Sequence, residues 1–253
     1  MDFLAVGILG SLWGSFANVC IYRLPLKGGV VKGRSFCPKC KKKIFCYENI
    51  PILSYLILGG KCSKCKKKIS TQYLLVEAIS IFSFLIIYYL FGISLTTILL
   101  IILFLSFLII FFIDLKYYII PDILTFPMMV LGFIKSFDPN LNPIFPNYTN
   151  SLLGGIIGYG IIWLIIMFYK KIRNREGMGL GDAKLLAVIG FWFGWISIPF
   201  VIFLSSTIAL IVVVPDLLKR QKKLTSQIPF GPYIIIATLF FLVFKANLLS
   251  LFL

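Results

Sequence analysis

Long apolar runs separated by short polar segments make up most of this 253-residue chain. An α-helix needs about 20 apolar residues to cross a bilayer, and most of the runs approach that length. We therefore expect an all-α polytopic membrane protein with about eight transmembrane helices. The expected spans are residues 3–22, 72–91, 96–113, 119–134, 151–169, 183–196, 197–214 and 231–251, of which 183–196 and 197–214 are the least clearly separated.

One polar segment, residues 25–71, interrupts this pattern near the N-terminus. It contains two cysteine pairs, Cys37-Pro38-Lys39-Cys40 and Cys62-Ser63-Lys64-Cys65, each followed by a run of lysines, so it resembles two copies of one knuckle. Residues 50–58 between the pairs are apolar but too short to span a bilayer. We expect them to fold back on the knuckles or to lie at the membrane surface. The predicted domains are a first helix over 1–24, this loop over 25–71 and a helical core over 72–253.

The four cysteines Cys37, Cys40, Cys62 and Cys65 have the spacing of a zinc site, although the 21 residues between the pairs slightly exceed the usual window. Four thiolates fill a tetrahedral Zn²⁺ site, so the metal would be structural and would fold a loop that has little apolar core. Disulfides are the alternative. Neighbouring lysines, which lower thiol pKa values, and a reducing compartment favour the metal. Cys20 and Cys46 are left over and are interpreted as ordinary small residues.

The composition agrees with a membrane protein, because 60% of the residues are hydrophobic and the mean hydropathy is +0.99. The net charge of +16 comes from lysine clusters between the apolar runs. Such clusters fit cytoplasmic loops that face an anionic leaflet better than they fit nucleic-acid binding. With residues 25–71 inside, the clusters near Lys170 and Lys219 also fall inside, and both termini fall outside. The N-terminus lacks the basic region of a cleaved signal peptide and is expected to be a retained span.

The chain contains no histidine, which excludes Ser-His-Asp and Cys-His hydrolases and His-ligated zinc proteases. Hydrolysis would then depend on carboxylates, and the expected topology places Asp114 and Asp182 at the same depth on the inner side. Two aspartates that share one proton can hydrolyse a peptide bond without a metal or a covalent nucleophile. Glycines before Asp182 would let an extended substrate approach the backbone. Gly179 and Gly181, together with Lys184 after the aspartate, are the predicted substrate-binding residues.

Each of these assignments has an alternative. Asp182 could simply cap the helix that follows it. Asp122 competes with Asp114 for the catalytic role, although its place after Pro121 favours a helix-cap or packing role. Lys184 could tune an aspartate or anchor the helix at the membrane interface. Glu77 lies inside an apolar span, where a charge is costly, and needs either a structural hydrogen bond or a substrate contact.

These motifs together resemble one known family. Gly179-x-Gly181-Asp182 matches the GxGD signature of membrane aspartic proteases. Residues 14–25, 113–122, 177–184 and 228–233, together with the cysteine pairs, are similar to the bacterial type IV prepilin peptidases nearly from end to end. The resemblance implies that Asp114 and Asp182 are the catalytic aspartates. It also implies cleavage of the short basic leader from type IV prepilins or pseudopilins at the cytoplasmic face of the inner membrane.

Many bacterial members of that family also methylate the new N-terminus with S-adenosylmethionine. Only the resemblance supports this second activity here, because no strand followed by G-x-G-x-x-G marks a nucleotide fold. Two other classes of function are the alternatives. A transporter or channel would place ionisable groups at the membrane midplane and would repeat between halves of the chain, and neither feature is visible. A structural component of a secretion system would use both aspartates only as helix caps.

Overall fold

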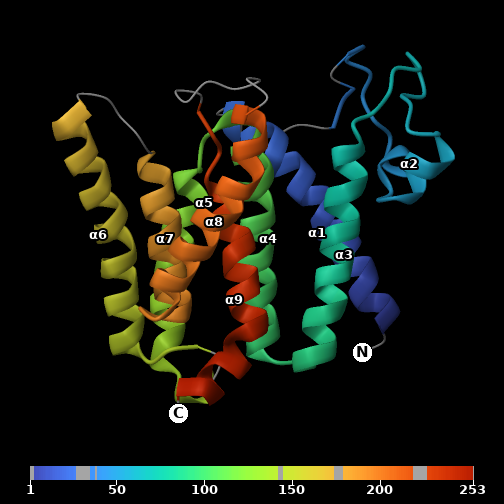
Figure 1. Ribbon diagram of the computed structural model, residues 1–253. Helices are drawn as coiled ribbons and strands as arrows, with labels where there is room; N and C mark the ends of the chain where they lie inside the picture. Colours follow the sequence, from blue (N-terminus) through green and yellow to red (C-terminus); the bar gives the residue numbers. More distant parts are fainter. Residues whose placement is uncertain are drawn as a thin grey trace. The chain divides into compact units, whose positions relative to one another are not determined.

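The computed structural model describes residues 3–26, 35–37, 39–141, 145–173, 179–218 and 227–252. The elements of these residues are helices, with two isolated β-bridges in the polar loop, which confirms the all-α prediction (Figure 1). By packing, the chain divides into two compact units, residues 1–109 and 110–253, with the boundary inside one helix. This division does not test the predicted domain boundaries at residues 24 and 71.

The first unit is a helix pair that carries the polar loop. Its elements are α1 (Phe3–Arg23), η1 (Leu24–Leu26), η2 (Cys46–Asn49), α2 (Leu53–Ile57), α3 (Thr71–Phe91) and the first part of α4 (Leu95–Tyr117). Helices α1 and α3 touch through small residues, since a Cβ on Gly14 would lie 2.9 Å from the Cα of Glu77. The Asn18 amide donates to the carbonyl of Tyr73 at 3.0 Å. Small residues let helices pack closely in lipid, and an asparagine can hydrogen-bond to a neighbouring helix, so both contacts are typical of membrane helix pairs.

The second unit contains the rest of α4 and five further helices. They are α5 (Asp122–Ile134), α6 (Tyr148–Arg173), α7 (Leu180–Phe193), α8 (Ser197–Leu218) and α9 (Gly231–Phe252), with the short turns η3 (Lys135–Phe137) and η4 (Pro139–Leu141) after α5. Helices α6 and α7 pack against each other (Figure 1). Glycines allow this contact, because a Cβ on Gly158 would lie 2.6 Å from the carbonyl oxygen of Leu186, and one on Gly190 would overlap the backbone of Gly154.

Polar contacts fix the end of α7 to α5 and its flanking turn. Gly132 leaves room for the Trp192 ring, whose Nε1 donates to the carbonyl of Met128 at 2.8 Å. The buried ammonium of Lys135 donates to the carbonyl of Trp192 at 3.1 Å and lies 4.0 Å from the centre of the Phe145 ring. The carbonyl of Trp192 belongs to the last turn of α7, where intrahelical donors are missing. A cation placed there also complements the helix dipole.

Helices occupy all eight predicted spans, but the number of membrane crossings is smaller by length. Among the described residues five helices are long and apolar enough to cross a membrane: α1, α3, α4, α6 and α8. Helices α5 and α7 have only 13 and 14 residues, and α9 offers the apolar stretch Gly231–Lys245. Eight crossings are therefore not confirmed. For α7 the reason is physical: its apolar residues are mostly buried inside the protein, so they pack a core in place of contacting lipid.

Candidate active site and metal centre

Asp114 lies in the last turn of α4, three residues before the helix ends at Tyr117. Its side chain is buried, with only 4% of the residue exposed, and its Oδ2 accepts a 2.9 Å hydrogen bond from the backbone N–H of Gly231. Gly231 is the first residue of α9, so this N–H is one of the donors that a helix leaves without an internal partner. The partial positive charge of the α9 N-terminus therefore acts directly on the Asp114 carboxylate.

Asp182 is the third residue of α7 and is 8% exposed. The N-cap position belongs to Gly179, so the alternative that Asp182 caps the helix is wrong. Its backbone N–H donates to the carbonyl of Gly179 at 3.2 Å, and its carboxylate turns back toward the same glycine. A buried carboxylate in the first turn is stabilised by the dipole of α7 without serving as its cap.

The two aspartates come close enough for their charges to repel each other. Ile120, in the short loop between α4 and α5, fills the space around them. A Cβ built on Gly231 would lie 3.2 Å from Cδ1 of Ile120, and a Cβ built on Gly181 would lie 3.0 Å from its Cβ. The same isoleucine thus packs against the glycine beside each aspartate. The fold brings together carboxylates that are 68 positions apart in the sequence.

The predicted substrate-binding residues have different surroundings. Within 4 Å of a Cβ placed on Gly179 lie only an oxygen of Asp182 and the backbone N of Gly181, whereas the corresponding space at Gly181 is taken by Ile120. The Lys184 ammonium donates to Oδ1 of Asp122 at 2.6 Å. Gly179 is therefore the open glycine beside Asp182, and Lys184 connects α7 to α5. Gly177, the first glycine of residues 177–184, lies outside the described residues.

Asp122 is the first residue of α5, and Pro121 occupies the N-cap position before it. The expectation that Asp122 caps this helix is therefore wrong. Its side chain is 54% exposed and pairs with Lys184, whose side chain is 22% exposed. Asp114 and Asp182 are both buried, so Asp122 differs from them in burial and in partner. The structure gives Asp122 an ion pair between α5 and α7, and the preference for a non-catalytic role stays a prediction.

Glu77 has a structural partner. Its Oε2 accepts a 2.8 Å hydrogen bond from the backbone N–H of Ile52, in the apolar part of the polar loop. Of the two uses that the sequence left open for Glu77, the structural hydrogen bond is the observed one. The contact joins α3 to the segment that precedes α2.

The four predicted metal ligands form one cluster. The Sγ atoms of Cys37, Cys40, Cys62 and Cys65 all lie within 4.8 Å of one another. Two of the separations are 4.0 Å, between Cys37 and Cys65, and 3.9 Å, between Cys40 and Cys62. A tetrahedron with Zn–S bonds of about 2.3 Å has S···S edges of about 3.8 Å, whereas a disulfide requires about 2.05 Å. The donor set therefore fits zinc, and the four thiols are free.

The two knuckles repeat residue for residue. The N–H of Lys41 donates to the carbonyl of Cys37, and the N–H of Lys66 donates to that of Cys62, with both lysines at φ 55°. The backbone N–H groups of Cys65 and Lys64 lower the pKa of the Cys62 thiol to about 6. One thiolate is therefore available at neutral pH, as a metal ligand requires. The predicted repeat is confirmed.

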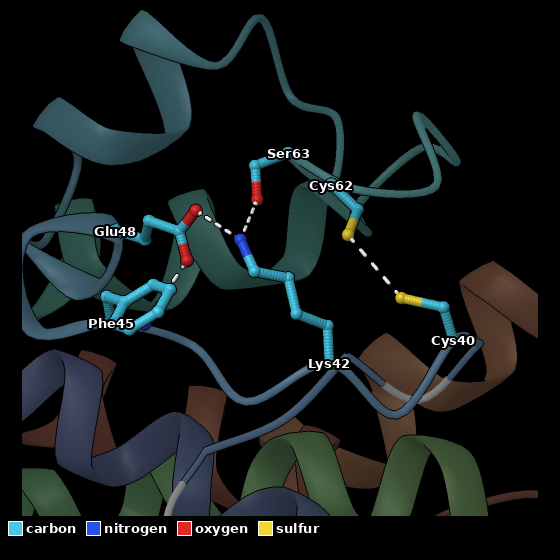
Figure 2. Close-up of polar contacts among 6 residues, drawn as sticks. All are labelled: Cys40, Lys42, Phe45, Glu48, Cys62 and Ser63. Carbon is cyan, nitrogen blue, oxygen red and sulfur yellow. Dashed lines mark hydrogen bonds and ion pairs between the residues drawn. The ribbon is translucent and has the colours of Figure 1, made fainter.

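A single lysine connects the knuckles. The Lys42 ammonium donates to Oε1 of Glu48 at 2.8 Å and to Oγ of Ser63 at 2.6 Å, and Glu48 also accepts from the N–H of Phe45 (Figure 2). The hydrogen bond from Lys42 is the main cause that lowers the pKa of Glu48 to about 2. Glu48 is therefore charged at any ordinary pH. The network holds the second knuckle through Ser63, which follows the ligand Cys62.

Sequence reasoning missed two residues of this site, Gly231 and Ile120. The proline and glycine of residues 228–233 indicate a helix start, and a helix start offers free N–H donors. Their partner, however, is 117 positions away and cannot be identified from local sequence. Ile120 lies in the range 113–122 that resembles the family, but nothing in the local sequence shows that it packs against glycines of α7 and α9.

Comparison with known proteins places the N-terminal part of the chain and most of its helical core in one family. Residues 8–91 match the bacterial peptidase A24 N-terminal domain, and residues 99–214 match the type IV leader peptidase family. A prepilin leader peptidase/N-methyltransferase from Pseudomonas aeruginosa is 36% identical, over 91% of this chain and 86% of its own length. The chain belongs to this family. A Neisseria gonorrhoeae protein of the same name is 34% identical, over 95% of this chain and 89% of its own length, whereas no solved structure matches significantly.

This chain is a member of the prepilin leader peptidase family, and each of its two candidate sites lies in a different matched region. The N-terminal match contains all four cysteines and the helix pair α1 and α3. The leader peptidase match contains Asp114, Asp122 and Asp182 but ends before α9. Gly231, which holds Asp114, therefore lies outside the matched regions.

Proposed function

We propose that this chain is a membrane aspartic endopeptidase in which Asp114 and Asp182 form the catalytic pair. One observation carries the proposal: two buried carboxylates from α4 and α7 interact, and each lies at a helix N-terminus. Like charges so close favour a state in which the pair shares one proton. The titration then belongs to the pair and not to either residue alone.

Such a pair cleaves a peptide through water. The ionised carboxyl group accepts a proton from a water molecule while the water oxygen bonds to the scissile carbonyl carbon. The protonated carboxyl group gives its proton to the carbonyl oxygen, which produces a neutral diol. Collapse of the diol breaks the C–N bond: the second carboxyl group regains a proton from a diol hydroxyl, and the departing amine takes the proton that came from water. The hydrogen bond from Gly231 orients Asp114 for this exchange and costs no rearrangement during the reaction.

The proposed substrates are type IV prepilins or pseudopilins, as in the names of the relatives and the sequence resemblance. We place the protein in the inner membrane and its catalytic pair at the cytoplasmic face, because lysine clusters then face an anionic leaflet. Gly179, where the space beside the backbone is open, is the proposed contact for the extended scissile segment. Gly181 and Lys184, which contact Ile120 and Asp122, are proposed to position α7 under the substrate.

Zinc is the proposed metal of the cysteine cluster. Cys37, Cys40, Cys62 and Cys65 would fill its four positions, so the ion would supply structure and no catalytic water. N-methylation of the new N-terminus is proposed from the names of the relatives alone. S-adenosylmethionine has no residues assigned to it within the described ranges, and the mechanism above concerns cleavage only.

The test is cleavage of a prepilin by purified protein in liposomes, with the variants Asp114→Asn, Asp182→Asn and Asp122→Asn. Asparagine keeps the shape of each side chain but cannot share a proton. We expect the first two variants to lose cleavage by at least about a thousandfold and Asp122→Asn to lose no more than a few-fold. Loss in Asp122→Asn and Asp182→Asn, with Asp114→Asn still cleaving, would make Asp122 the partner of Asp182 in place of Asp114. Wild-type cleavage in all three would reject the aspartic mechanism.

A further inference from the structure

The polar loop exposes a cluster of large apolar side chains between its two knuckles. The most exposed are Ile57 at 82%, Tyr47 at 68% and Leu56 at 62%. Phe45, Ile50 and Leu53 belong to the same stretch and are also exposed. We call these six residues the apolar stretch. So many neighbouring apolar side chains outside the spanning helices indicate a surface that another phase or molecule covers.

A hydrogen bond fixes the depth of this stretch along α3. The N–H of Ile52 is held by Glu77, which lies six residues beyond the start of α3 at Thr71. At a rise of about 1.5 Å per residue, the bond lies about 9 Å inside the end of a helix that is long enough to cross a membrane. In Figure 1, α2 accordingly lies beside the first turns of α3. If the bilayer surface lies at the start of α3, this contact holds the stretch at the level of the headgroups and the first acyl carbons.

The backbone of this segment suits such a depth, because its N–H groups have partners within the protein. Ser54, Leu56 and Leu58 donate to the carbonyls of residues 50, 52 and 54. Ile52 has a φ of 60°, which a β-branched residue adopts only when its surroundings impose it. The contact with Glu77 is one constraint that imposes it. Unpaired backbone groups would be costly in the acyl region, and these are paired.

The positive charge of the polar loop favours an anionic partner for the apolar stretch. Eight lysines of the knuckles are exposed: Lys39, Lys41, Lys43, Lys61, Lys64, Lys66, Lys67 and Lys68. The one acidic residue of residues 25–71 is Glu48, and Lys42 neutralises it. Lysines around an apolar stretch attract anionic lipid headgroups. A substrate with a basic leader would be repelled by the same lysines.

We propose that the apolar stretch is an interfacial anchor that inserts into an anionic leaflet, with the exposed lysines of the knuckles on its headgroups. The anchor ties the metal-binding loop to the membrane surface through Glu77. The surface is thus a lipid contact, and it holds the loop at a constant depth whatever reaction the helices of the second unit perform.

Photo-crosslinking in vesicles tests the proposal without any measurement of activity. p-Benzoylphenylalanine is placed at Leu56 or Ile57, and at Tyr55 as the matched control, because the Tyr55 ring packs against Gly60 of the same loop. The protein is reconstituted in phosphatidylcholine mixed with phosphatidylglycerol. We expect phospholipid adducts at positions 56 and 57 and adducts within the protein at 55. Equal lipid yields at all three positions would overturn the anchor.

Two further comparisons separate the partners. Phosphatidylglycerol should exceed its share of the bilayer among the adducts by at least about twofold, and Lys43→Gln with Lys68→Gln should remove that excess. An unchanged excess in this double variant would reject the role of the lysines. Prepilin is then added to the vesicles. If prepilin adducts replace lipid adducts at Leu56 and Ile57, the stretch is a protein-docking surface and the proposal is wrong.

Discussion

The backbone N–H of Gly231 lies 2.9 Å from Oδ2 of Asp114 and donates to it, which joins the first residue of α9 to the last turn of α4. The contact needs a glycine. A Cβ at position 231 would lie 2.8 Å from the same oxygen and 3.2 Å from Cδ1 of Ile120. The residue that supplies the donor is therefore also the residue whose missing side chain lets the carboxylate approach.

Replacing Gly231 by alanine should impair cleavage with little effect on substrate binding. The new Cβ must displace the Asp114 carboxylate or the start of α9, and a displaced carboxylate cannot activate water in the right position. We expect kcat for prepilin cleavage to fall by about tenfold or more while KM changes little. Steady-state kinetics in detergent measures both constants.

Gly160→Ala is the matched control, because nothing lies within 4 Å of a Cβ at that position of α6. It should cleave like the wild type. If Gly231→Ala also cleaves like the wild type, the contact with Asp114 has no catalytic importance. If both variants lose activity equally, the loss reflects a general sensitivity of the helices to added side chains.

The Asp122–Lys184 pair should position α7 without acting in the reaction. Its members are partly exposed, so we expect their coupling to be worth about 1 kcal/mol or less. In a double-mutant cycle, Asp122→Asn and Lys184→Met should each lower kcat a few-fold. The kcat of the double variant should be no lower than that of the less active single variant. Fully additive losses would show that Lys184 acts on something other than Asp122, as its predicted substrate contact requires.

Much of the fold could be predicted because lipid imposes a simple rule on sequence. Each predicted span is occupied by a helix, and the cysteine spacing predicted the cluster at Cys37, Cys40, Cys62 and Cys65. The absence of histidine, the expected topology and the family resemblance together selected Asp114 and Asp182 from the nine acidic residues. These features are local or compositional, so they can be recognised without knowledge of the packing.

The rest depended on contacts between distant residues. An apolar run has the same composition whether it faces lipid or protein, so the buried α7 was counted as a membrane span. The stacked glycines of α6 and α7, such as Gly154 and Gly190, are ordinary residues until the helices are aligned. Lys135 is a further example, because it directly follows an apolar run and nothing in the local sequence indicates its partner. In the structure it is 4% exposed and bonded to Trp192.

Lys135→Met should therefore destabilise the protein more than a surface lysine change does. Methionine keeps the volume but removes the donor to the Trp192 carbonyl and the cation beside Phe145. We expect a loss of about 2–4 kcal/mol, because a buried charge-assisted hydrogen bond and a cation–π contact disappear together. Thermal unfolding in detergent measures the change. Lys171→Met, at an exposed position of α6, is the control and should shift stability by no more than about 0.5 kcal/mol. Equal shifts in the two variants would contradict the role given to Lys135.

The Lys42 network should control how firmly the knuckles hold their metal. Lys42→Met removes the donor to Glu48 and to Ser63, so the second knuckle loses a contact next to the ligand Cys62. We expect zinc to pass to a chromophoric chelator about tenfold faster from this variant than from the wild type. Lys64→Met, an exposed position in the same knuckle, should release zinc at the wild-type rate.

The effect of Lys42→Met on zinc release should not depend on pH above the ordinary Glu48 pKa of 4.5. The Lys42 hydrogen bond lowers the pKa of Glu48 to about 2, so the stability that this bond contributes is fully present above 4.5 and is lost as the pH falls toward 2. Zinc loss from the wild type at higher pH must then come from protonation of the thiolates. We expect the ratio of the variant's release rate to that of the wild type to stay constant from neutral pH down to about 5. A constant ratio supports thiolate protonation, and not loss of the Lys42–Glu48 contact, as the cause of zinc release in this interval. A ratio that falls toward one within that interval would mean that the Lys42–Glu48 pair itself titrates there, against the pKa that the geometry gives it.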